Sequence, residues 1–374
     1  MVIFPTQGIG SLPKPKLEDL LEDSFWKKEL GKNIASAKEM YYKGNKKDAR
    51  ALFNLLLLEK AGLDIVYDGE AHRIEMYQHP AENIDGTEFF YSGGKKEWVR
   101  SFDHNYFCQA QCLSQLGLKI PYHLEEFLFV IKNTSKEIKL PVTGAYTLAD
   151  WSFNPYYLPL PENRIGEPNQ RLVKYQAKEK LAVEFAEKII RPLLETILRS
   201  SRTRLRIQID EPAATTKPTE IPIFVNSFNK SLKGLQANKY KASVHICYSR
   251  DYRILFPYLA KLECSQLALE FANRDGWELG VSDEKRKGYH VLKGFKSLEK
   301  NFDIGLGVVD VHTNRVESPE LVRDRILYAA QILGPEKIYV NPDCGLRTRS
   351  LKIAFKKLRN TVEGAKLARK EFEN

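Results

Sequence analysis

The sequence predicts an α/β protein in which residues 1–374 form a single (β/α)8 barrel of the TIM type, and two observations favour this fold. Short runs of β-branched and aliphatic residues alternate with longer amphipathic segments, and no linker divides the chain. The runs number eight and cover 2–4, 63–67, 140–146, 205–209, 242–246, 267–269, 304–309 and 338–340. Eight strands alternating with helices are typical of a closed parallel barrel. A doubly wound open sheet is the structural alternative.

Helix signals lie between these runs. In the segment SPELVRDRILYAAQIL, Ser318 is the expected N-cap, Pro319 lies in the first turn and Gly334 follows the last residue. Pro192 should begin or kink a helix in the long segment before the fourth run, because proline has no N–H to donate within a helix.

About residues 86–101 interrupt the alternation. The segment GTEFFYSGGKKEWVRSF predicts a β-hairpin that turns at Ser92, Gly93 and Gly94 and is inserted after the second strand. The proline-rich stretch NPYYLPLPENRIGEPNQ predicts a long loop after the third strand.

Composition limits the classes of function. No stretch approaches the roughly 20 apolar residues that span a bilayer, and the first residues lack a secretory pattern, so we expect a cytoplasmic protein. The net charge of +10 is spread along the chain, without a zinc finger or a basic–aromatic array, so we expect no binding to nucleic acid. Five cysteines do not suggest a disulfide framework. We assign Cys108 and Cys112 to the core.

Side chains capable of chemistry follow the predicted strands. The active site of a (β/α)8 barrel lies at the C-terminal ends of its strands, where residues distant in the sequence meet. The residues at these ends are Glu70, Asp210, His245, Cys247, Glu270, Asp310, His312 and Cys344. We therefore expect them to share one mouth of the barrel.

The tripeptide His245-Ile246-Cys247 suggests a metal site. Residues two apart on a strand point to the same side, and zinc prefers nitrogen and sulfur ligands in a tetrahedral arrangement. Glu270 and Cys344 would complete the set from two other strand ends. The alternative is a buried cysteine beside a core histidine. Cys264 precedes its strand and lies at the wrong end, so we expect it to pack in the core.

The tripeptide Asp310-Val311-His312 forms a second pair. A carboxylate beside an imidazole raises the pKa of the imidazole and orients it, which suits a proton donor. The alternative is a pair of loop residues that make only structural hydrogen bonds. Without the four candidate zinc ligands, the sequence would favour neither interpretation.

These residues occur in segments that resemble the catalytic domain of cobalamin-independent methionine synthases along the whole chain. The matching segments are IGSLP at 9–13, DGEAHRIEM at 68–76, YTLADWSF at 146–153, QIDEPA at 208–213, HICYS at 245–249, GVVDVHTNRVES at 307–318 and VNPDCGLRTR at 340–349. QIDEPA and the last segment are the most specific.

The resemblance implies a zinc-dependent methyltransferase that methylates L-homocysteine to L-methionine. The zinc ligands would be His245, Cys247, Glu270 and Cys344. The amino-acid substrate would be held by Ile9, Gly10 and Ser11, with Glu70 and Asp210 receiving its ammonium group. Trp151 would stack near the methyl donor. His312, with Asp310, would supply the proton.

Departures from the family pattern concern the methyl donor. Long members carry a second, N-terminal barrel that this sequence lacks, and the short members are the closer likeness. Asp150 replaces an asparagine, residues 214–216 contain no acidic side chain, and RSFDHNYF replaces a segment that contacts the donor. A methylated pterin or folate and a methylcorrinoid, free or on a corrinoid protein, both remain candidate donors. A partner chain supplying the missing barrel is a further alternative.

Three other functions compete with this interpretation. The first is methylation of another thiol such as coenzyme M, which offers no ammonium group to Glu70 and Asp210. The second is a non-catalytic zinc-bearing barrel acting as a subunit. The third is a barrel decarboxylase of the uroporphyrinogen type, which would leave the zinc ligands unexplained.

Overall fold

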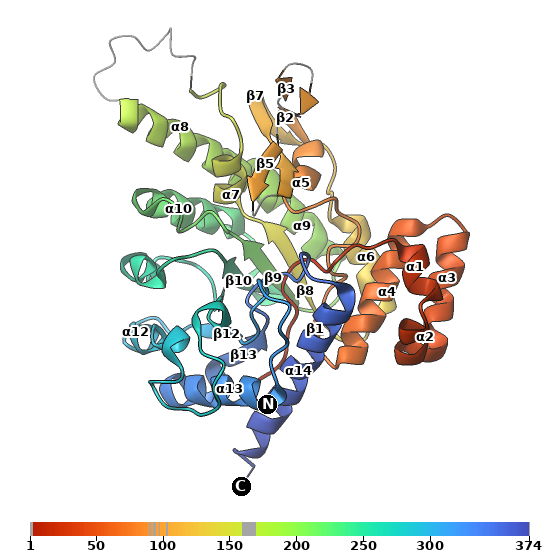
Figure 1. Ribbon diagram of the computed structural model, residues 1–374. Coiled ribbons are helices and arrows are strands. Elements are labelled where there is room, and N and C mark those ends of the chain that lie inside the picture. Colours follow the sequence, from red (N-terminus) through yellow and green to blue (C-terminus); the bar gives the residue numbers. More distant parts are fainter. Residues whose placement is uncertain are drawn as a thin grey trace.

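The computed structural model describes residues 3–89, 91–92, 95–96, 98–101, 104–158 and 170–373 (Figure 1). Its centre is a seven-stranded parallel sheet in the order β1-β8-β9-β10-β11-β12-β13. The strands are β1 Ile65–Val66, β8 Glu137–Thr143, β9 Leu205–Asp210, β10 Tyr240–Ile246, β11 Gln266–Leu269, β12 Asp303–Gly307 and β13 Ile338–Asn341.

The N-terminal segment closes this sheet into a barrel. Thr6 forms a parallel bridge with Val340 of β13, and Gln7 forms one with Ile65 of β1. The Gln7 N–H donates to the Val340 carbonyl at 2.8 Å, and the Gly8 N–H donates to the Ile65 carbonyl at 3.1 Å. The eighth position of the ring is thereby filled, and the predicted barrel fold is confirmed.

Two strands lie furthest from their predicted positions. The first strand position lies at Thr6 and Gln7 rather than at 2–4, of which Val2 lies outside the described residues. Phe4 has a φ of +52°, which a β-strand does not accommodate. The third strand ends at Thr143, and the expected continuation to Tyr146 is instead the first turn of a helix.

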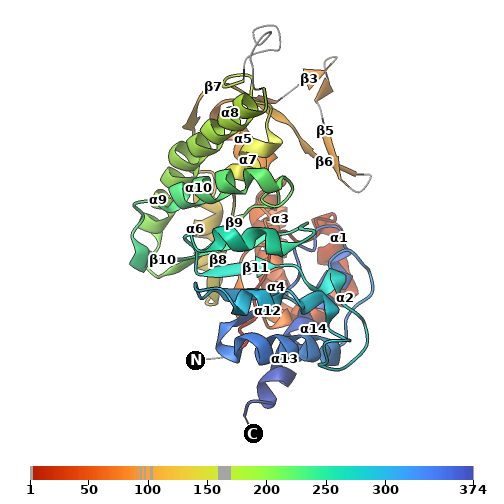
Figure 2. The ribbon, with the colours of Figure 1, turned by 90° about the vertical axis from the view of Figure 1, so that its left-hand side faces the viewer.

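Helices lie around the outside of the sheet (Figures 1 and 2). Pro192 lies in the first turn of α9, and Ser318 caps α13 by accepting a hydrogen bond from the Leu321 N–H at 3.2 Å, as predicted. The helices are α1 Leu17–Glu22, α2 Ser24–Leu30, α3 Ile34–Tyr42, α4 Lys46–Ala61, α5 Gln78–Glu82, α6 Leu124–Asn133, α7 Ala145–Trp151, α8 Gln170–Glu184, α9 Arg191–Ser200, α10 Ile221–Leu232, α11 Phe256–Leu259, α12 Leu292–Lys296, α13 Pro319–Leu333 and α14 Leu351–Lys370.

A β-rich arm follows the second strand position, as the interruption at 86–101 predicts. The arm is longer than expected: β2 Ile84–Phe89 pairs with β7 Ala110–Leu118 in antiparallel fashion. Between them, β3 Tyr91–Ser92 pairs with β4 Lys95–Lys96, and β5 Trp98–Ser101 pairs with β6 His104–Cys108. The expected turn residues Gly93 and Gly94 lie outside the described residues. The arm projects at the end of the molecule opposite the C-terminus (Figures 1 and 2).

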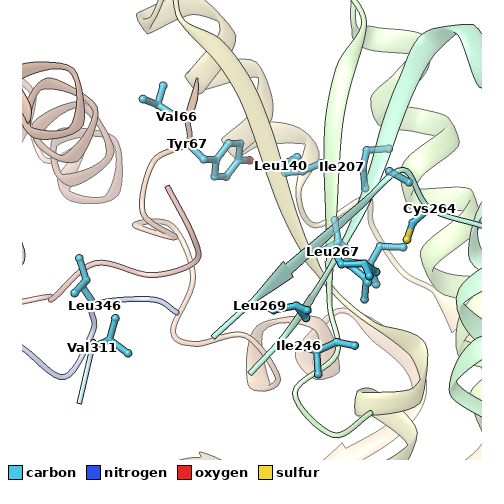
Figure 3. Packing of buried hydrophobic residues seen from close by; sticks show 14 of the residues in the cluster. Val66, Tyr67, Leu140, Ile207, Ile246, Cys264, Leu267, Leu269, Val311 and Leu346 are labelled. Atoms are coloured by element: carbon cyan, nitrogen blue, oxygen red, sulfur yellow. The ribbon is translucent and has the colours of Figure 1, made fainter. Parts of the chain in front are cut away.

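The core holds the strands in place through apolar contacts (Figure 3). Leu140, Ile207 and Leu267 come from β8, β9 and β11, and all three are fully buried. Cys264 is buried in the same cluster, as predicted for a cysteine that precedes its strand. None of the helices in the described ranges combines the length and the apolar character that a membrane crossing requires.

Candidate active site

A cavity of about 420 Å³ lies at the C-terminal ends of the strands and gathers most of the predicted site residues. It is lined by Ile9, Gly10, Ser11, Glu70, Met76, Asp210, Pro212, His245, Cys247, Tyr248, Val311, His312, Cys344, Gly345, Arg347, Thr348 and Arg349. Nine of the predicted site residues are in this set. The other three, Glu270, Asp310 and Trp151, do not line the cavity.

His245, Cys247 and Cys344 form a compact cluster in this cavity. One ligand atom from each lies within 4.8 Å of the other two. His245 and Cys247 stand at the end of β10, while Cys344 follows β13. The His245 Nδ1 lies 3.0 Å from the Ala268 carbonyl oxygen, and His245 Nε2 lies 3.4 Å from Cys344 Sγ. Because a carbonyl only accepts, Nδ1 carries a proton and Nε2 faces the sulfur.

The electrostatics of the cluster favour a thiolate. A hydrogen bond from Cys247 lowers the pKa of the Cys344 thiol, and the His245 imidazole lowers it further. Burial alone would lower the pKa of His245, but the neighbouring Cys344 raises it above its usual value. A half-buried thiolate with an imidazole nitrogen beside it is a pair of ligands that zinc prefers.

Glu270, the residue after β11, lies outside the compact cluster of the other three candidate ligands, although its charge raises the pKa of His245. Its side chain is fully buried, and Oε2 accepts hydrogen bonds from the Tyr248 N–H at 2.8 Å and from Asn273 Nδ2 at 3.4 Å. Among the described residues, Oε1 has no hydrogen-bond partner and lies 3.7 Å from His312 Nε2. A buried carboxylate oxygen without a donor is costly, so the site suits a cation.

The pairing of His312 differs from the one expected within the tripeptide 310–312. Asp310 Oδ1 accepts a hydrogen bond from the backbone N–H of His312 at 2.8 Å, so this carboxylate holds the loop. The physical reason is that β12 ends at Gly307, and strand alternation does not extend to 310–312. Glu270 is the carboxylate that the ion pair places beside the imidazole, and it raises the pKa of His312 above the usual value. The charge of Asp310 raises this pKa as well, as predicted, but less than Glu270 does.

Two buried carboxylates, Glu70 and Asp210, also line the cavity, and Asp210 is the register partner of His245 on the neighbouring strand. Burial raises the pKa of Asp210 to about 7, and the charge of Glu70 raises it as well. Burial also raises the pKa of Glu70, against the effects of Arg73 and Lys14. A cationic group bound between two such carboxylates would relieve the cost of ionising both.

The N-terminal segment passes beside these carboxylates. Gly10 has a φ of +53°, and a Cβ at this position would lie 3.7 Å from Glu70 Oε1. The Ser11 carbonyl accepts a hydrogen bond from the Leu346 N–H at 2.8 Å, which ties the segment to the loop after β13. Backbone groups of 9–11 are thereby presented to the cavity.

Trp151 lies at the end of α7 and is not among the residues that line the cavity. The centroid of its ring lies 6.1 Å from that of Tyr77.

Sequence reasoning missed Tyr248, which lines the cavity. This residue has a φ of +58°, and its ring centroid lies 5.9 Å from that of His312. Sequence reasoning also missed Arg347 and Arg349. All three lie in segments that resemble the family, at 245–249 and 340–349, and this resemblance could have identified them as site residues.

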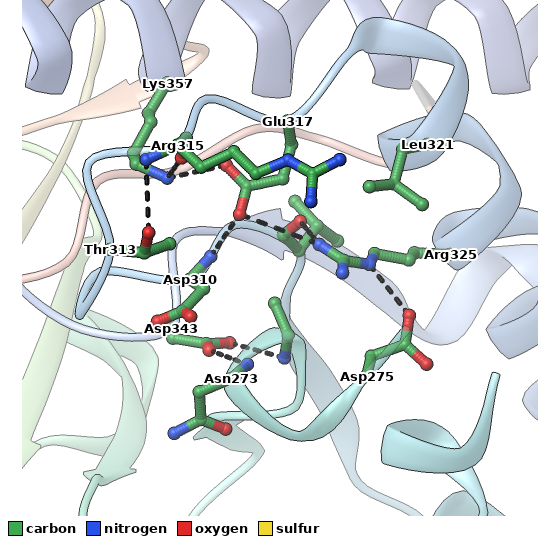
Figure 4. Close-up of polar contacts among 12 residues, drawn as sticks. Asn273, Asp275, Asp310, Thr313, Arg315, Glu317, Leu321, Arg325, Asp343 and Lys357 are labelled. Carbon is green, nitrogen blue, oxygen red and sulfur yellow. Dashed lines mark hydrogen bonds and ion pairs between the residues drawn. The ribbon is translucent and has the colours of Figure 1, made fainter. Parts of the chain in front are cut away.

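A buried ionic network supports the loops that carry these residues (Figure 4). Glu317 accepts hydrogen bonds from the Asp310 N–H at 2.8 Å and from Lys357 Nζ at 2.7 Å. Arg325 donates to Asp275 Oδ2 at 3.0 Å and to the Val308 carbonyl at 2.8 Å. The network therefore links the loops after β11 and β12 to helices α13 and α14. The sequence did not predict this network, because its charged residues lie far apart in the chain and form no motif.

A histidine outside the cavity braces the turn of Glu70. His72 Nδ1 lies 2.8 Å from Asp68 Oδ2, and His72 Nε2 lies 2.8 Å from Asp48 Oδ1. Asp68 Oδ1 in turn accepts a hydrogen bond from the Glu70 N–H at 2.8 Å. Burial lowers the pKa of His72, but its bonds to Asp68 and Asp48 outweigh burial and raise the pKa above 6.5.

This arrangement predicts a pH-dependent stability. The raised pKa means that protonated His72 stabilises the folded state fully below the unfolded pKa, near 6.5, and that the contribution is lost as pH rises through the folded pKa. The difference in free energy of unfolding between the native chain and His72→Gln should be largest near about pH 6 and shrink toward about pH 9. Urea denaturation measures it, and a difference that grows with pH would contradict the assignment.

Known proteins resemble this chain in sequence and structure. The catalytic domain of cobalamin-independent synthases matches residues 4–164 and 202–367. A methionine synthase of Thermoplasma acidophilum is 41% identical over 374 residues, which cover 97% of each chain. A methionine synthase of Pyrococcus horikoshii is 37% identical over 372 residues, covering 99% of this chain and 94% of the other.

Among solved structures, a B12-independent methionine synthase of Shewanella sp. W3-18-1 in complex with selenomethionine aligns with a TM-score of 0.74. The alignment covers 99% of both chains at 23% identity, which establishes a common fold. The sequence matches extend from the closing segment of the barrel through the loop after β13, and therefore include the whole cavity. The chain belongs to the family of cobalamin-independent methionine synthases and matches its catalytic domain.

Proposed function

We propose that this chain is a zinc-dependent methionine synthase that transfers a methyl group to the thiol of L-homocysteine. The observation that carries the proposal is that one cavity is lined both by an imidazole and two thiols in a compact cluster and by two buried carboxylates. Family membership and relatives named methionine synthase at up to 41% identity support the same activity.

The side chains fit a zinc ion. His245, Cys247 and Cys344 would hold it, and Glu270 would supply a fourth ligand through the carboxylate oxygen that has no donor among the described residues. The hydrogen bond from His245 Nδ1 to the Ala268 carbonyl fixes the imidazole in the orientation that metal-ligating histidines require. Zinc bound there would lower the pKa of the substrate thiol so that a sulfur nucleophile exists at neutral pH.

The carboxylates of Glu70 and Asp210 would select the substrate. Homocysteine carries an ammonium group, and Glu70 and Asp210 offer two buried acceptors for it. Binding this cation would shift both groups toward their ionised forms, because a nearby positive charge offsets the burial that raises their pKa values. Backbone groups of 9–11 would position the remainder of the amino acid.

His312 would act as the proton donor to the leaving group. The Glu270 carboxylate raises the pKa of His312 and thus favours its protonated form. The side chain is 33% exposed at the cavity, so it can reach a bound donor. With a methylated pterin, the new bond joins sulfur to carbon, the nitrogen–carbon bond breaks, and the proton of His312 goes to that nitrogen. A methylcorrinoid donor needs no such proton.

Cys344→Ser should abolish tight zinc binding. Serine is a poor ligand for zinc compared with a thiolate, and Cys344 is the member of the cluster with the lowered thiol pKa. Metal analysis of the purified chain should give about one zinc for the native protein and far less for the variant. Cys264→Ser is the matched control, since Cys264 is also buried but packs in the apolar core. Full zinc occupancy in Cys344→Ser would count against the proposed site.

Asp210→Asn should raise the KM for homocysteine by roughly 10–100-fold, because a hydrogen bond between charged groups contributes about 1.5–3 kcal/mol. Steady-state kinetics with homocysteine and with 4-mercaptobutanoate, which lacks the amino group, would isolate the effect. The variant should lose most of its preference for homocysteine. An unchanged preference would favour a different thiol as the natural substrate.

His312→Gln distinguishes the candidate donors. With a methylated pterin, loss of a general acid should lower kcat by roughly 10²–10⁴-fold. With methylcobalamin, the variant should retain the native rate. A donor panel on the isolated chain, including methyltetrahydrofolates with one and several glutamates, would also show whether a partner chain is required. Equal losses with both donor classes would remove His312 from the proton-transfer role.

A further inference from the structure

We propose that Asp343 is a positioning residue that sets the metal affinity of the site by holding the ends of β11, β12 and β13 together. This inference rests on the proposed zinc-dependent function. Asp343 immediately precedes Cys344, is fully buried, and directs its carboxylate into the loop after β11 (Figure 4).

The carboxylate of Asp343 accepts hydrogen bonds from three consecutive backbone N–H groups. Its Oδ1 lies 2.9 Å from the Phe271 nitrogen and 3.0 Å from the Ala272 nitrogen. Its Oδ2 lies 2.7 Å from the Asn273 nitrogen. These residues directly follow Glu270, so one side chain fixes the backbone that continues from this carboxylate.

The main chain of Asp343 reaches the third strand end. Its N–H donates to the Val309 carbonyl at 3.0 Å, and the Val308 N–H donates to the Asn341 carbonyl at 2.9 Å. The loop between Val309 and the helix α13 carries His312. Asp343 therefore contacts all three loops that present Glu270, His312 and Cys344.

Gly307 leaves the space that this carboxylate occupies. A Cβ built on Gly307 would lie 2.1 Å from Asp343 Oδ1 and 2.7 Å from the Leu269 carbonyl oxygen. Any other residue at the end of β12 would force the Asp343 carboxylate, the neighbouring backbone or both to move. The sequence thus provides a second way to disturb Asp343 without altering a candidate ligand.

The consequence concerns the distance between ligands. Cys344 is attached to Asp343, and Glu270 is attached to the segment that Asp343 binds. Loss of the carboxylate would free the loop after β11 relative to Cys344, while leaving all four candidate ligands in the sequence. Residues that orient metal ligands in this indirect way typically change metal affinity by about 10–100-fold.

The test is a zinc titration of the full chain against a chromophoric chelator, together with thermal unfolding of the metal-free form. We expect Asp343→Asn and Gly307→Ala each to weaken zinc binding by about 10–100-fold. In Asp343→Asn the new amide NH₂ would face the Asn273 N–H, so two donors would oppose each other.

Glu211→Gln is the matched control. Glu211 is equally buried, and its carboxylate also accepts two consecutive backbone N–H groups, from Tyr146 at 3.1 Å and Thr147 at 2.8 Å. Its own backbone N–H donates to the His245 carbonyl at 2.8 Å, a bond that the side-chain substitution leaves in place. It should lower the unfolding temperature without weakening zinc binding. If Asp343→Asn or Gly307→Ala lowered only the unfolding temperature, Asp343 would be a purely structural residue. A native chain that binds no zinc would instead overturn the proposed function.

Discussion

The parallel pairing of β10 with β11 places His245 opposite Ala268, and the hydrogen bond between the imidazole and the Ala268 carbonyl follows from that register. This bond leaves only Nε2 free to face Cys344. A shift of one residue would turn His245 to the other side of the sheet. The candidate metal centre therefore depends on strand register before it depends on any loop.

The loops beyond the strands are held by charges rather than by apolar packing. Arg325, Asp275, Glu317 and Lys357 are all buried or nearly so, and each has an oppositely charged partner. Burying these charges is costly unless they are paired, so the network is a poor source of stability in itself. Its effect is geometric, because it leaves the loops after β11 and β12 few alternative conformations. The closing segment at Thr6 and Gln7 joins β13 to β1 by backbone bridges and so completes the ring of strands.

Much of this arrangement could be predicted from the sequence, because two rules convert residue order into position. Alternating strands and helices predict a barrel, and its C-terminal mouth collects the residues that follow each strand. These rules alone bring His245, Cys247 and Cys344 into one cavity, as the structure does. They fail where the backbone leaves regular structure. Phe4 adopts a positive φ, and Asp310 accepts a hydrogen bond from the backbone N–H of His312. Contacts such as that of Asp343 with the loop after β11 depend on tertiary structure and have no local signal.

In the proposed function, four side chains hold one zinc ion at a position that accepts the sulfur of homocysteine. X-ray absorption at the zinc edge, recorded with and without homocysteine, tests it most directly. We expect the zinc ion to have two sulfur ligands in the free protein, from Cys247 and Cys344, and a third after the substrate is added. A sulfur count that stays the same when homocysteine is bound would contradict it.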